Sequence, residues 1–321
     1  MSADPTFADV RAAAERIADR AHRTPILTCR TLDASTGQRL FFKCENFQKV
    51  GAFKFRGASN AVLCLSDAEA RQGVITHSSG NHAAALALAA RMRGIPATVV
   101  MPRTASRIKR EAVAGYGAEI IPCEPTLESR ETTAAERIAQ TGATFIHPYD
   151  DPRIIAGAGT AALELLEDVA SLDLLLTPIG GGGLTSGSAL AVSGLSPDTD
   201  LIAVEPAGAD DAYRSLRAGR RIPQTDPRTI ADGLLTSLSE RTFRLIRAHA
   251  REIVTVSDDA IVGAMRRIWE RMKIVVEPSA AVPLAALLEE KIPTRYRRIG
   301  IILSGGNVDL DHLPWTEAAP R

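Results

Sequence analysis

The feature that most constrains the fold is a regular alternation of short apolar runs with longer segments of helical spacing. Several short runs are continuous stretches of Val, Ile and Leu, which is typical of strands covered on both faces in parallel sheets. We predict strands at 39–45, 73–79, 97–102, 119–123, 172–179, 201–206, 252–256 and 298–304. We predict helices at 81–93, 106–116, 127–141, 157–171, 184–194, 257–273 and 278–290, after an N-terminal helix that ends before Pro25.

This order of elements predicts the fold class and the domain organisation. Strand–helix alternation implies an α/β protein with mostly parallel sheets, helices on both faces and right-handed crossovers. Residues 71–149 hold three or four strand–helix units of their own. We therefore expect a small α/β domain at 71–149, inserted into a large domain formed by 1–70 and 150–321.

The composition excludes several classes of function. The chain has 321 residues, with 38 Lys and Arg against 38 Asp and Glu. A net charge of zero lacks the broad attraction that nucleic-acid and acidic-membrane binders need, so we expect neither partner. There is no apolar run long enough to span a membrane, and the N-terminus is charged, without a signal sequence. The cysteines show no CxxC pair and are read as free thiols of a cytoplasmic protein: Cys29, Cys44, Cys64 and Cys123.

Loops at the carboxyl ends of strands carry the chemistry in α/β sheets. In the first such loop, Lys54 stands between two phenylalanines at the start of a helical segment. Loss of water there would lower its pKa and make its amine nucleophilic. Alternatively, Lys54 is a surface lysine whose stem packs on apolar neighbours. Lys43 and Lys49, nearby, are read as ordinary solvated lysines.

A second loop, 76–82, is small and polar and leads into an Ala/Leu-rich helix. The N–H groups of the helix start, together with Ser78, Ser79 and Asn81, form an anion site suited to a carboxylate. Simple capping of the helix is the alternative, although it needs only one of these residues. His82 could be a first-turn residue without a role.

A third loop holds four consecutive glycines, 180–183, between a buried strand and a helix. Such a sequence is favoured where the backbone approaches a ligand closely or adopts positive φ, and N–H groups at a helix start bind phosphate. The loop is neither GxGxxG with its acidic partner nor a Walker A motif. It therefore predicts phosphate binding without a nucleotide fingerprint.

Two further strand ends carry polar residues. Glu205 is followed by Asp210 and Asp211, and such carboxylates can share a hard cation with backbone carbonyls or simply cap a helix. Ser304 ends a strand ahead of two glycines, so its hydroxyl is expected to point into the same site.

Together, these loops describe a site for pyridoxal 5′-phosphate (PLP). The chain resembles the fold-type II PLP enzymes, whose fold is like that of the tryptophan synthase β chain, and in particular the family of serine racemases and serine/threonine dehydratases. The resemblance runs from about residue 23 to 310 and is carried by ordered motifs: FKFRGA, SSGNHA, AGAGTAALE, GGGGL, EPAGADDAY, ADGL, MKIVVEPSAA and LSGGNVDL.

The resemblance implies roles for the cofactor-binding residues. Lys54 would form the Schiff base with PLP, and Phe53 would pack beside the ring. The glycine loop would hold the phosphate, through Gly180, Gly181, Gly182 and Gly183. Asn81 would bind the ring hydroxyl and Ser304 would meet the pyridine nitrogen. A serine there leaves the nitrogen largely unprotonated, which suits elimination.

The same resemblance implies the substrate contacts and the proton transfers. The substrate carboxylate would bind the loop formed by Ser78, Ser79, Gly80, Asn81 and His82. Lys54 would act as the base at Cα. Ser79 matches the serine that faces this lysine across the substrate in serine racemases, where dehydratases of the threonine type commonly have alanine.

Further positions match sites near the substrate side chain and a cation. Arg130 and Thr236 match residues near the side chain, and a guanidinium can clamp a second carboxylate. A solvated position on the predicted helix 127–141 is the alternative for Arg130. The cation site would consist of Glu205, the carbonyl of Ala209, and Asp211. Mg²⁺ is the expected ion, and Ca²⁺ or Mn²⁺ could replace it.

The sequence therefore predicts a PLP-dependent dehydratase (ammonia-lyase). Its substrate would be a β-hydroxy amino acid, namely 3-hydroxyaspartate, serine or threonine, and its products a 2-oxo acid and ammonia. Arg130 favours 3-hydroxyaspartate. A serine racemase with side dehydratase activity is the alternative, and a binding protein for phosphorylated metabolites is a rival from another class. We expect a homodimer. Val50 and Ala52 depart from the family's Thr-Gly-Ser pattern and put the substrate preference, though not the Schiff base, in doubt.

Overall fold

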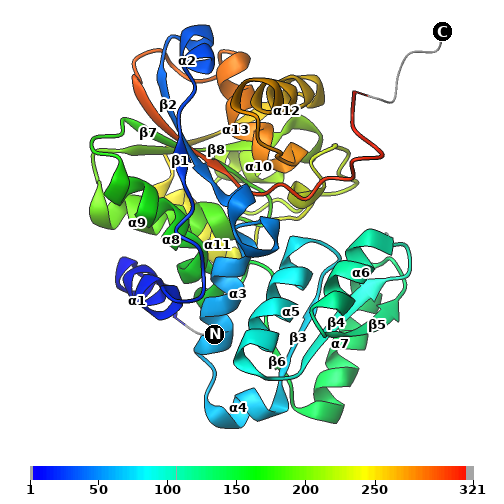
Figure 1. The fold of residues 1–321 in the computed structure, drawn as a ribbon. Coiled ribbons are helices and arrows are strands. Elements are labelled where there is room, and N and C mark those ends of the chain that lie inside the picture. Colours follow the sequence, from blue (N-terminus) through cyan, green and yellow to red (C-terminus); the bar gives the residue numbers. More distant parts are fainter. Residues whose placement is uncertain (1–2, 106, 316–321) are drawn as a thin grey trace, which may run out of the picture.

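The computed structural model describes residues 3–105 and 107–315, whose strands form two sheets (Figure 1). The larger sheet has the order β1 (Ile26–Leu27), β2 (Arg39–Cys44), β10 (Arg298–Leu303), β7 (Leu174–Pro178), β8 (Asp200–Pro206) and β9 (Glu252–Val256). All of its pairs are parallel except the antiparallel pair β1–β2. The smaller sheet is parallel throughout, in the order β5 (Glu119–Cys123), β4 (Ala97–Pro102), β3 (Val74–His77) and β6 (Thr144–Phe145).

Helices cover both faces of the larger sheet. Successive residues of one strand face opposite layers: Leu174 and Leu176 pack in one core, and Leu175 packs in the other. One face is covered by α2 (Arg30–Thr36), α12 (Asp258–Met272) and α13 (Pro278–Leu288). The other face is covered by α1 (Phe7–Ile17), α8 (Pro152–Asp168) and α9 (Gly183–Leu195), with α10 (Asp211–Ala218) and α11 (Glu240–His249) toward the β9 edge.

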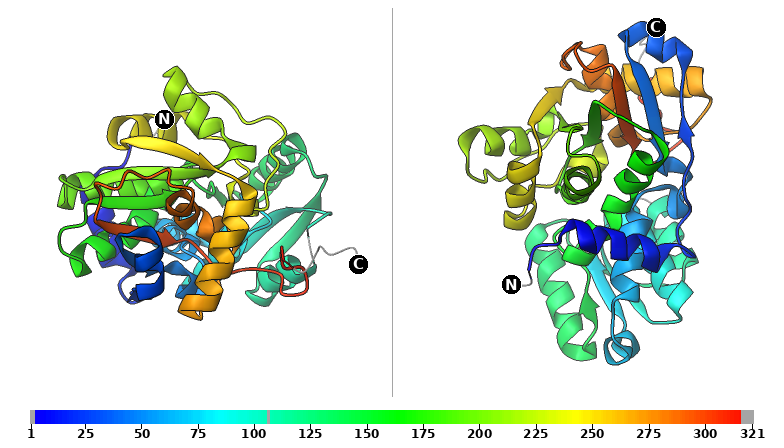
Figure 2. Two further views of the ribbon diagram at one scale, coloured as in Figure 1. Left: turned by 90° about the horizontal axis from the view of Figure 1, so that it is seen from above. Right: turned by 90° about the vertical axis from the view of Figure 1, so that its left-hand side faces the viewer.

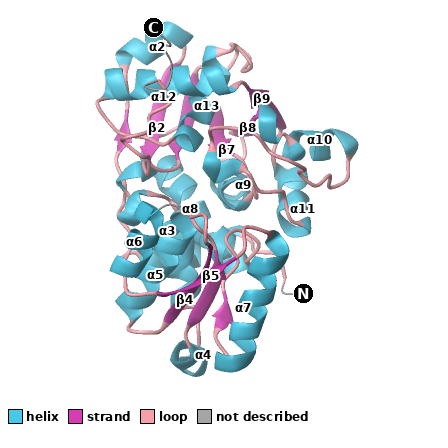
Figure 3. Ribbon diagram, turned by 90° about the vertical axis from the view of Figure 1, so that its right-hand side faces the viewer, coloured by secondary structure: helices cyan, strands magenta, loops and turns pink. Residues whose placement is uncertain are grey.

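The smaller sheet is also enclosed by helices, with α7 on one side and α5 on the other (Figure 3). Its helices are α5 (Asn81–Arg93), α6 (Arg107–Gly115) and α7 (Leu127–Thr141). A further helix, α3 (Lys54–Leu63), packs against α5 on one side and α8 on the other, and leads into α4 (Asp67–Gln72). It therefore links the two sheets, while α1 lies across α8 and α3 (Figure 2).

The predicted α/β class with mostly parallel sheets and helices on both faces is confirmed. The strands predicted at 97–102, 119–123 and 252–256 and the helices predicted at 81–93 and 127–141 have the observed bounds. These helices end where Gly94 and Gly142 adopt the left-handed conformation that glycine favours. For the helix predicted at 106–116, the structure gives α6, and residue 106 lies outside the described residues.

Other elements were missed or misplaced. The short strands β1 and β6 and the helices α2, α4, α10 and α11 were not predicted. The helix predicted at 157–171 begins instead at Pro152, because the side chain of Asp151 accepts a hydrogen bond from Arg153 N and caps it. Proline at the first helical position favours that earlier start.

Two findings concern the whole of the described chain. Residues 3–105 and 107–315 contain no helix that is long and apolar enough to cross a membrane. The four cysteines are free; Cys64 is exposed and the other three are buried.

Candidate active site

Lys54 is the first residue of α3, and its backbone is fixed by the end of β10. Phe53 N donates to Ser304 O at 3.0 Å, and Ala52 forms an isolated bridge with Gly305. The Lys54 Nζ atom donates to Pro148 O at 2.8 Å and lies 5.2 Å from the centroid of the Phe53 ring. Burial lowers the pKa of Lys54 to about 8, against the opposing effect of the Glu277 carboxylate. An amine with such a pKa is a suitable nucleophile and base near neutral pH.

The loop between β3 and α5 presents backbone donors. Gly80 N-caps α5, and its own N–H donates to Ser78 Oγ at 3.3 Å. Among the described residues, no acceptor is found for the N–H groups of Ser79, Asn81 and His82. Free N–H groups at a helix N-terminus attract an anion, so the loop can hold a carboxylate.

The glycine loop is the second set of free donors. Gly182 has φ of +86° and N-caps α9. A Cβ at Gly181 would lie 2.4 Å from the Tyr149 ring, and one at Gly180 would lie 2.9 Å from Leu234 Cα. Within the described chain, the N–H groups of Gly181, Gly182 and Gly183 have no acceptor. The loop therefore combines close backbone approach with unused donors, and both properties fit a phosphate group.

Glu277, at the N-cap of α13, is a site residue that the sequence reasoning missed. Asn81 Nδ2 donates to its two carboxylate oxygens at 3.0 and 3.1 Å, and Asn307 N donates to Oε2 at 3.1 Å. Asn307 Nδ2 also donates to Asn81 Oδ1 at 2.9 Å. Burial raises the pKa of Glu277 to about 7. Its place in the motif MKIVVEPSAA was a signal, but the sequence did not show its partners.

Aromatic side chains form a second group that was missed. His147 Nδ1 accepts hydrogen bonds from Tyr149 N at 3.3 Å and Asp150 N at 2.9 Å, so its Nε2 carries the proton. The His147 ring lies edge-on to Tyr149 at 4.6 Å and to His77 at 6.0 Å. Burial lowers the pKa of His147 to about 4. His147 is therefore neutral at physiological pH.

The remaining candidate residues lie on several different elements. Ser304 is buried just after β10, and its carbonyl oxygen accepts the hydrogen bond from Phe53 N. His82 is buried, with its Nε2 at 3.3 Å from Ile146 O and its Nδ1 without a partner. Arg130 lies on α7 with a buried Nε that has no partner, and its charge acts on His77. Thr236 is exposed in the segment after η4 (Asp232–Leu234).

The predicted cation ligands are buried together at the start of α10. The Glu205 oxygens accept hydrogen bonds from Ala212 N at 3.1 Å and Tyr213 N at 2.9 Å, as the capping alternative predicts. Asp211 Oδ2 accepts from Leu238 N at 3.0 Å, whereas Asp211 Oδ1 is buried without a partner. Burial raises the pKa of Glu205 to about 9 and that of Asp211 to about 6.

The described residues hold no cluster of three or more His, Cys, Asp or Glu side chains arranged for a metal. The predicted set has only two carboxylates and a carbonyl. An orphaned carboxylate oxygen beside a second buried acid nevertheless fits a hard cation.

One prediction near the site is wrong. Lys43 was read as solvated, but its side chain is fully buried and pairs with Glu164 at 2.5 Å. Lys49 is half-buried.

Comparison with known proteins decides the family. The family profile described as "PALP: Pyridoxal-phosphate dependent enzyme" matches residues 17–305. The chain belongs to this family of PLP-dependent enzymes. This membership favours an enzyme over the binding protein that the sequence left open.

Relatives of this PLP enzyme are similar over nearly the whole chain. It is 55% identical over 311 residues to a beta-hydroxyaspartate dehydratase of Paracoccus denitrificans (strain Pd 1222), covering 97% of this chain and 99% of the relative. It is 50% identical to an L-threo-3-hydroxyaspartate ammonia-lyase of Saccharomyces cerevisiae, covering 95% of this chain and 94% of the relative. The crystal structure of serine racemase from Dictyostelium discoideum is similar with a TM-score of 0.93 and 46% identity, covering 96% of this chain and 100% of that one. These likenesses establish the fold-type II architecture.

Proposed function

We propose that this PLP enzyme is a dehydratase that removes water from 3-hydroxyaspartate to give a 2-oxo acid and ammonia. Two relatives above 45% identity are named for hydroxyaspartate, and they match nearly the full chain. The structural observation that carries the proposal is Arg130, whose guanidinium has no hydrogen-bond or ion-pair partner among the described residues, whereas Arg137 on the same helix pairs with Glu119. A guanidinium with an unused donor suits the second carboxylate of the substrate, which serine and threonine lack.

The proposed mechanism assigns each step to residues of this chain. Lys54 and the glycine loop would hold PLP, which when bound would supply the electron sink that makes the Cα–H bond acidic. The substrate carboxylate binds the free N–H groups of Ser79, Asn81 and His82. Once the substrate amine has replaced it, Lys54, with a pKa of about 8, would remove the Cα proton. Its ammonium group would then protonate the β-hydroxyl, which leaves as water. Asn81, held by Glu277, and Phe53 orient the ring.

The test of the substrate is a panel of L- and D-serine, threonine and the hydroxyaspartate diastereomers, scored for the 2-oxo acid. Arg130→Met should raise KM for hydroxyaspartate and leave KM for serine unchanged. Arg137→Met is the matched control, because Arg137 lies on the same helix and pairs with Glu119 at 2.6 Å. A preference of the wild type for serine, or equal losses on both substrates, would contradict the assignment.

Serine racemisation is a second candidate, supported by Ser79, which precedes Asn81 on the carboxylate loop and could donate a proton opposite Lys54. Ser79→Ala should then abolish α-proton exchange from D-serine, with a loss of about 10²–10⁴-fold, and spare elimination from an L-substrate. Equal losses with both enantiomers would leave Ser79 a carboxylate-binding residue only. No activity on any D-substrate in the wild type would leave an L-specific dehydratase.

We also propose that Glu205, Asp211 and the Ala209 carbonyl bind Mg²⁺, which Ca²⁺ or Mn²⁺ could replace. The unpaired Asp211 Oδ1 and the lack of an ion pair from either acid to a described residue support this site. Its role would be structural, since it lies at the start of α10 and away from Lys54.

We propose a homodimer, supported by exposed apolar side chains on adjoining segments. Phe47 and Val275 are 45% and 44% exposed, and Asn46 Nδ2 donates to Val275 O at 3.1 Å. Leu310, at 65% exposure, follows on the segment after β10. Sedimentation equilibrium tests this proposal, and a monomer at micromolar concentration would contradict it.

A further inference from the structure

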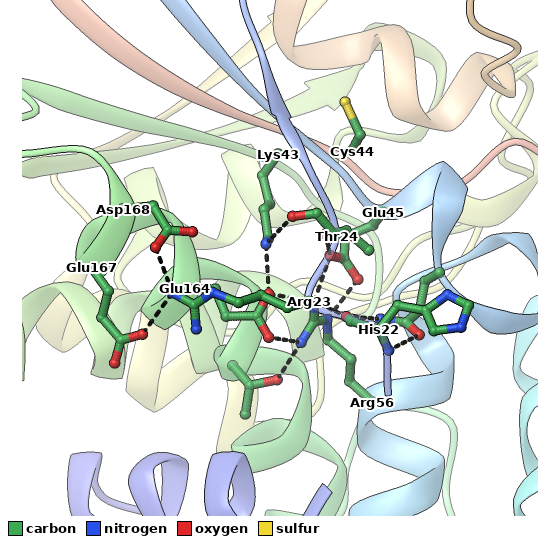
Figure 4. A network of polar contacts seen from close by, with 12 residues as sticks. His22, Arg23, Thr24, Lys43, Cys44, Glu45, Arg56, Glu164, Glu167 and Asp168 are labelled. Atoms are coloured by element: carbon green, nitrogen blue, oxygen red, sulfur yellow. Dashed lines mark hydrogen bonds and ion pairs between the residues drawn. The ribbon is translucent and has the colours of Figure 1, made fainter. Parts of the chain in front are cut away.

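Two residues beyond Lys54, the buried Arg56 lies between Glu45 and Glu164 (Figure 4). Its Nε and Nη2 donate to Glu45 at 2.7 and 2.9 Å. Its Nη1 and Nη2 donate to Glu164 at 2.7 and 2.8 Å. The side chains of Arg56 and Glu45 are fully buried, and that of Glu164 is 14% exposed. Arg56 therefore makes two bidentate ion pairs in the interior.

Further contacts extend these pairs into a network that joins five segments. Lys43 Nζ, from β2, donates to Glu164 at 2.5 Å and to Thr24 O at 2.7 Å. Thr24 Oγ1 donates to Glu45 at 2.5 Å. Thus the segment before β1, β2, η1 (Glu45–Phe47), α3 and α8 are tied together, with two cations matching two anions.

The electrostatics of the network favour the charged forms of Arg56 and Glu164. Burial by itself would raise the pKa of Glu164, but the hydrogen bonds and the charge of Arg56 hold it below its ordinary value. The two glutamates raise the pKa of Arg56 despite its burial. A protonated arginine bonded to an ionised glutamate, as Arg56 is to Glu164, gives the strong, directional form of the hydrogen bond.

Stability alone does not account for such a network. Apolar side chains of similar volume often stabilise a protein interior at least as much as buried ion pairs, because the paired charges lose their hydration on burial. What planar, bidentate bonds add is a fixed geometry between the segments that carry them. Here they fix how α3 is rotated and placed against α8 and η1.

The residue whose position depends on α3 is Lys54. Its helix turn is held from one side by the bond between Phe53 N and Ser304 O, and Arg56 N donates to Phe53 O at 2.9 Å. The side chain of Arg56 holds the same turn from the opposite side. We propose that Arg56 is a positioning residue, whose bonds to Glu45 and Glu164 fix the first turn of α3 and thereby place the Lys54 amine. The inference rests on the proposed role of Lys54 as the reacting amine.

The experiment compares Arg56→Lys with Lys43→Met. The first variant keeps the charge but loses the bidentate bonds on α3, whereas the second removes an equally buried member of the network that lies on β2. Three quantities are measured on the full chain: the melting temperature, kcat and its pH profile for the holoenzyme, and the pH dependence of Lys54 acylation after the cofactor has been removed, read by peptide mass spectrometry.

We expect both variants to melt earlier and only Arg56→Lys to change Lys54. In that variant kcat should fall by about 10²-fold, the scale of a misplaced reacting group. The pKa of Lys54 in the acylation assay should rise from about 8 toward its ordinary value, because the loosened turn admits water. Lys43→Met should keep the wild-type acylation profile and a kcat close to that of the wild type.

The same measurements can also contradict the proposal. If both variants lose kcat in proportion to their loss of stability, and Lys54 acylation is unchanged, the network is only structural. Should Arg56→Lys not fold, Glu45→Gln breaks the bidentate pair that Glu45 forms with Arg56 Nε and Nη2 and is measured in the same way. A wild-type acylation profile in that variant overturns the proposal. Acylation does not depend on turnover, so a failure of the dehydratase assignment leaves this test intact.

Discussion

The protein buries carboxylates in two regions that differ in what neutralises them. In the region beneath α3, Glu45 and Glu164 meet Arg56 and Lys43 at 2.5–2.9 Å. At the start of α10, Glu205 and its neighbouring acid receive only backbone N–H groups from the described residues. The carboxylates of the first region are paired with cations, whereas neither acid of the second forms an ion pair with a described residue.

This difference shows how the surroundings decide the state of a buried acid. Removing a carboxylate from water favours its protonated form unless a cation or several donors compensate. Arg56 therefore keeps the pKa of Glu164 below its ordinary value, whereas burial raises the pKa of Glu205 to about 9. Such a site stays protonated unless a cation compensates it, as we propose for Mg²⁺ at Glu205 and Asp211. Glu277 is intermediate, because neutral amides compensate it in part and its pKa is about 7.

The largest effect expected from this comparison concerns Arg56. Arg56→Met leaves Glu45 and Glu164 buried without their main partner, and loss of one member of a buried pair costs about 3–5 kcal/mol. Denaturant unfolding should show this loss of free energy. A loss below about 1 kcal/mol would mean that Arg56 contributes no more than an exposed ion pair does, and would contradict its role in compensating the buried glutamates.

The next effect is a pH dependence from Glu277. Its pKa lies near 4.5 when unfolded and at about 7 when folded. The folded state therefore binds more protons between these values, and stability should fall as the pH rises from 4.5 to 7, by at most about 3 kcal/mol. Glu277→Gln should flatten this slope in the full chain. Glu289→Gln, at the other end of α13, is the control and should keep it.

The third effect tests the uncompensated region. Mg²⁺ at about 100 times its dissociation constant should stabilise the wild type by about 2.7 kcal/mol, if it binds only the folded state. Glu205→Gln should abolish this gain in a thermal melt. Asp210→Asn should retain it, because Asp210 pairs with Arg214 at 2.7 Å and lies outside the proposed ligands. A wild type that responds to none of Mg²⁺, Ca²⁺ and Mn²⁺ would remove the cation site.

The smallest effect comes from a pair outside both regions. Arg23 contacts Glu167 and Asp168 at 3.0 and 2.6 Å, but its side chain is 52% exposed. Arg23→Met should therefore cost no more than about 1 kcal/mol in the same unfolding assay. A loss as large as that of Arg56→Met would mean that burial does not separate the two kinds of pair.

The sequence by itself determined the class of the fold and indicated most of the loops that we propose carry the chemistry. Continuous apolar runs predicted the parallel strands. Helical spacing that stops at Gly94 and Gly142 predicted α5 and α7 with their observed bounds. Such signals are local, because residue pattern and backbone conformation act within one or two turns. The FKF segment and the four glycines were conspicuous for the same reason. They break the pattern of their own neighbourhood.

Only the tertiary structure decided which side chains meet. Asn81 and Glu277 are 196 residues apart in the chain, Lys54 and Pro148 are 94 apart, and no local pattern links either pair. Lys43 shows the limit most clearly. Its neighbourhood resembles that of a solvated lysine, yet it is fully buried because Glu164, 121 residues away on α8, compensates its charge. Burial and charge balance depend on what the folded chain brings near, and a linear pattern does not contain that information.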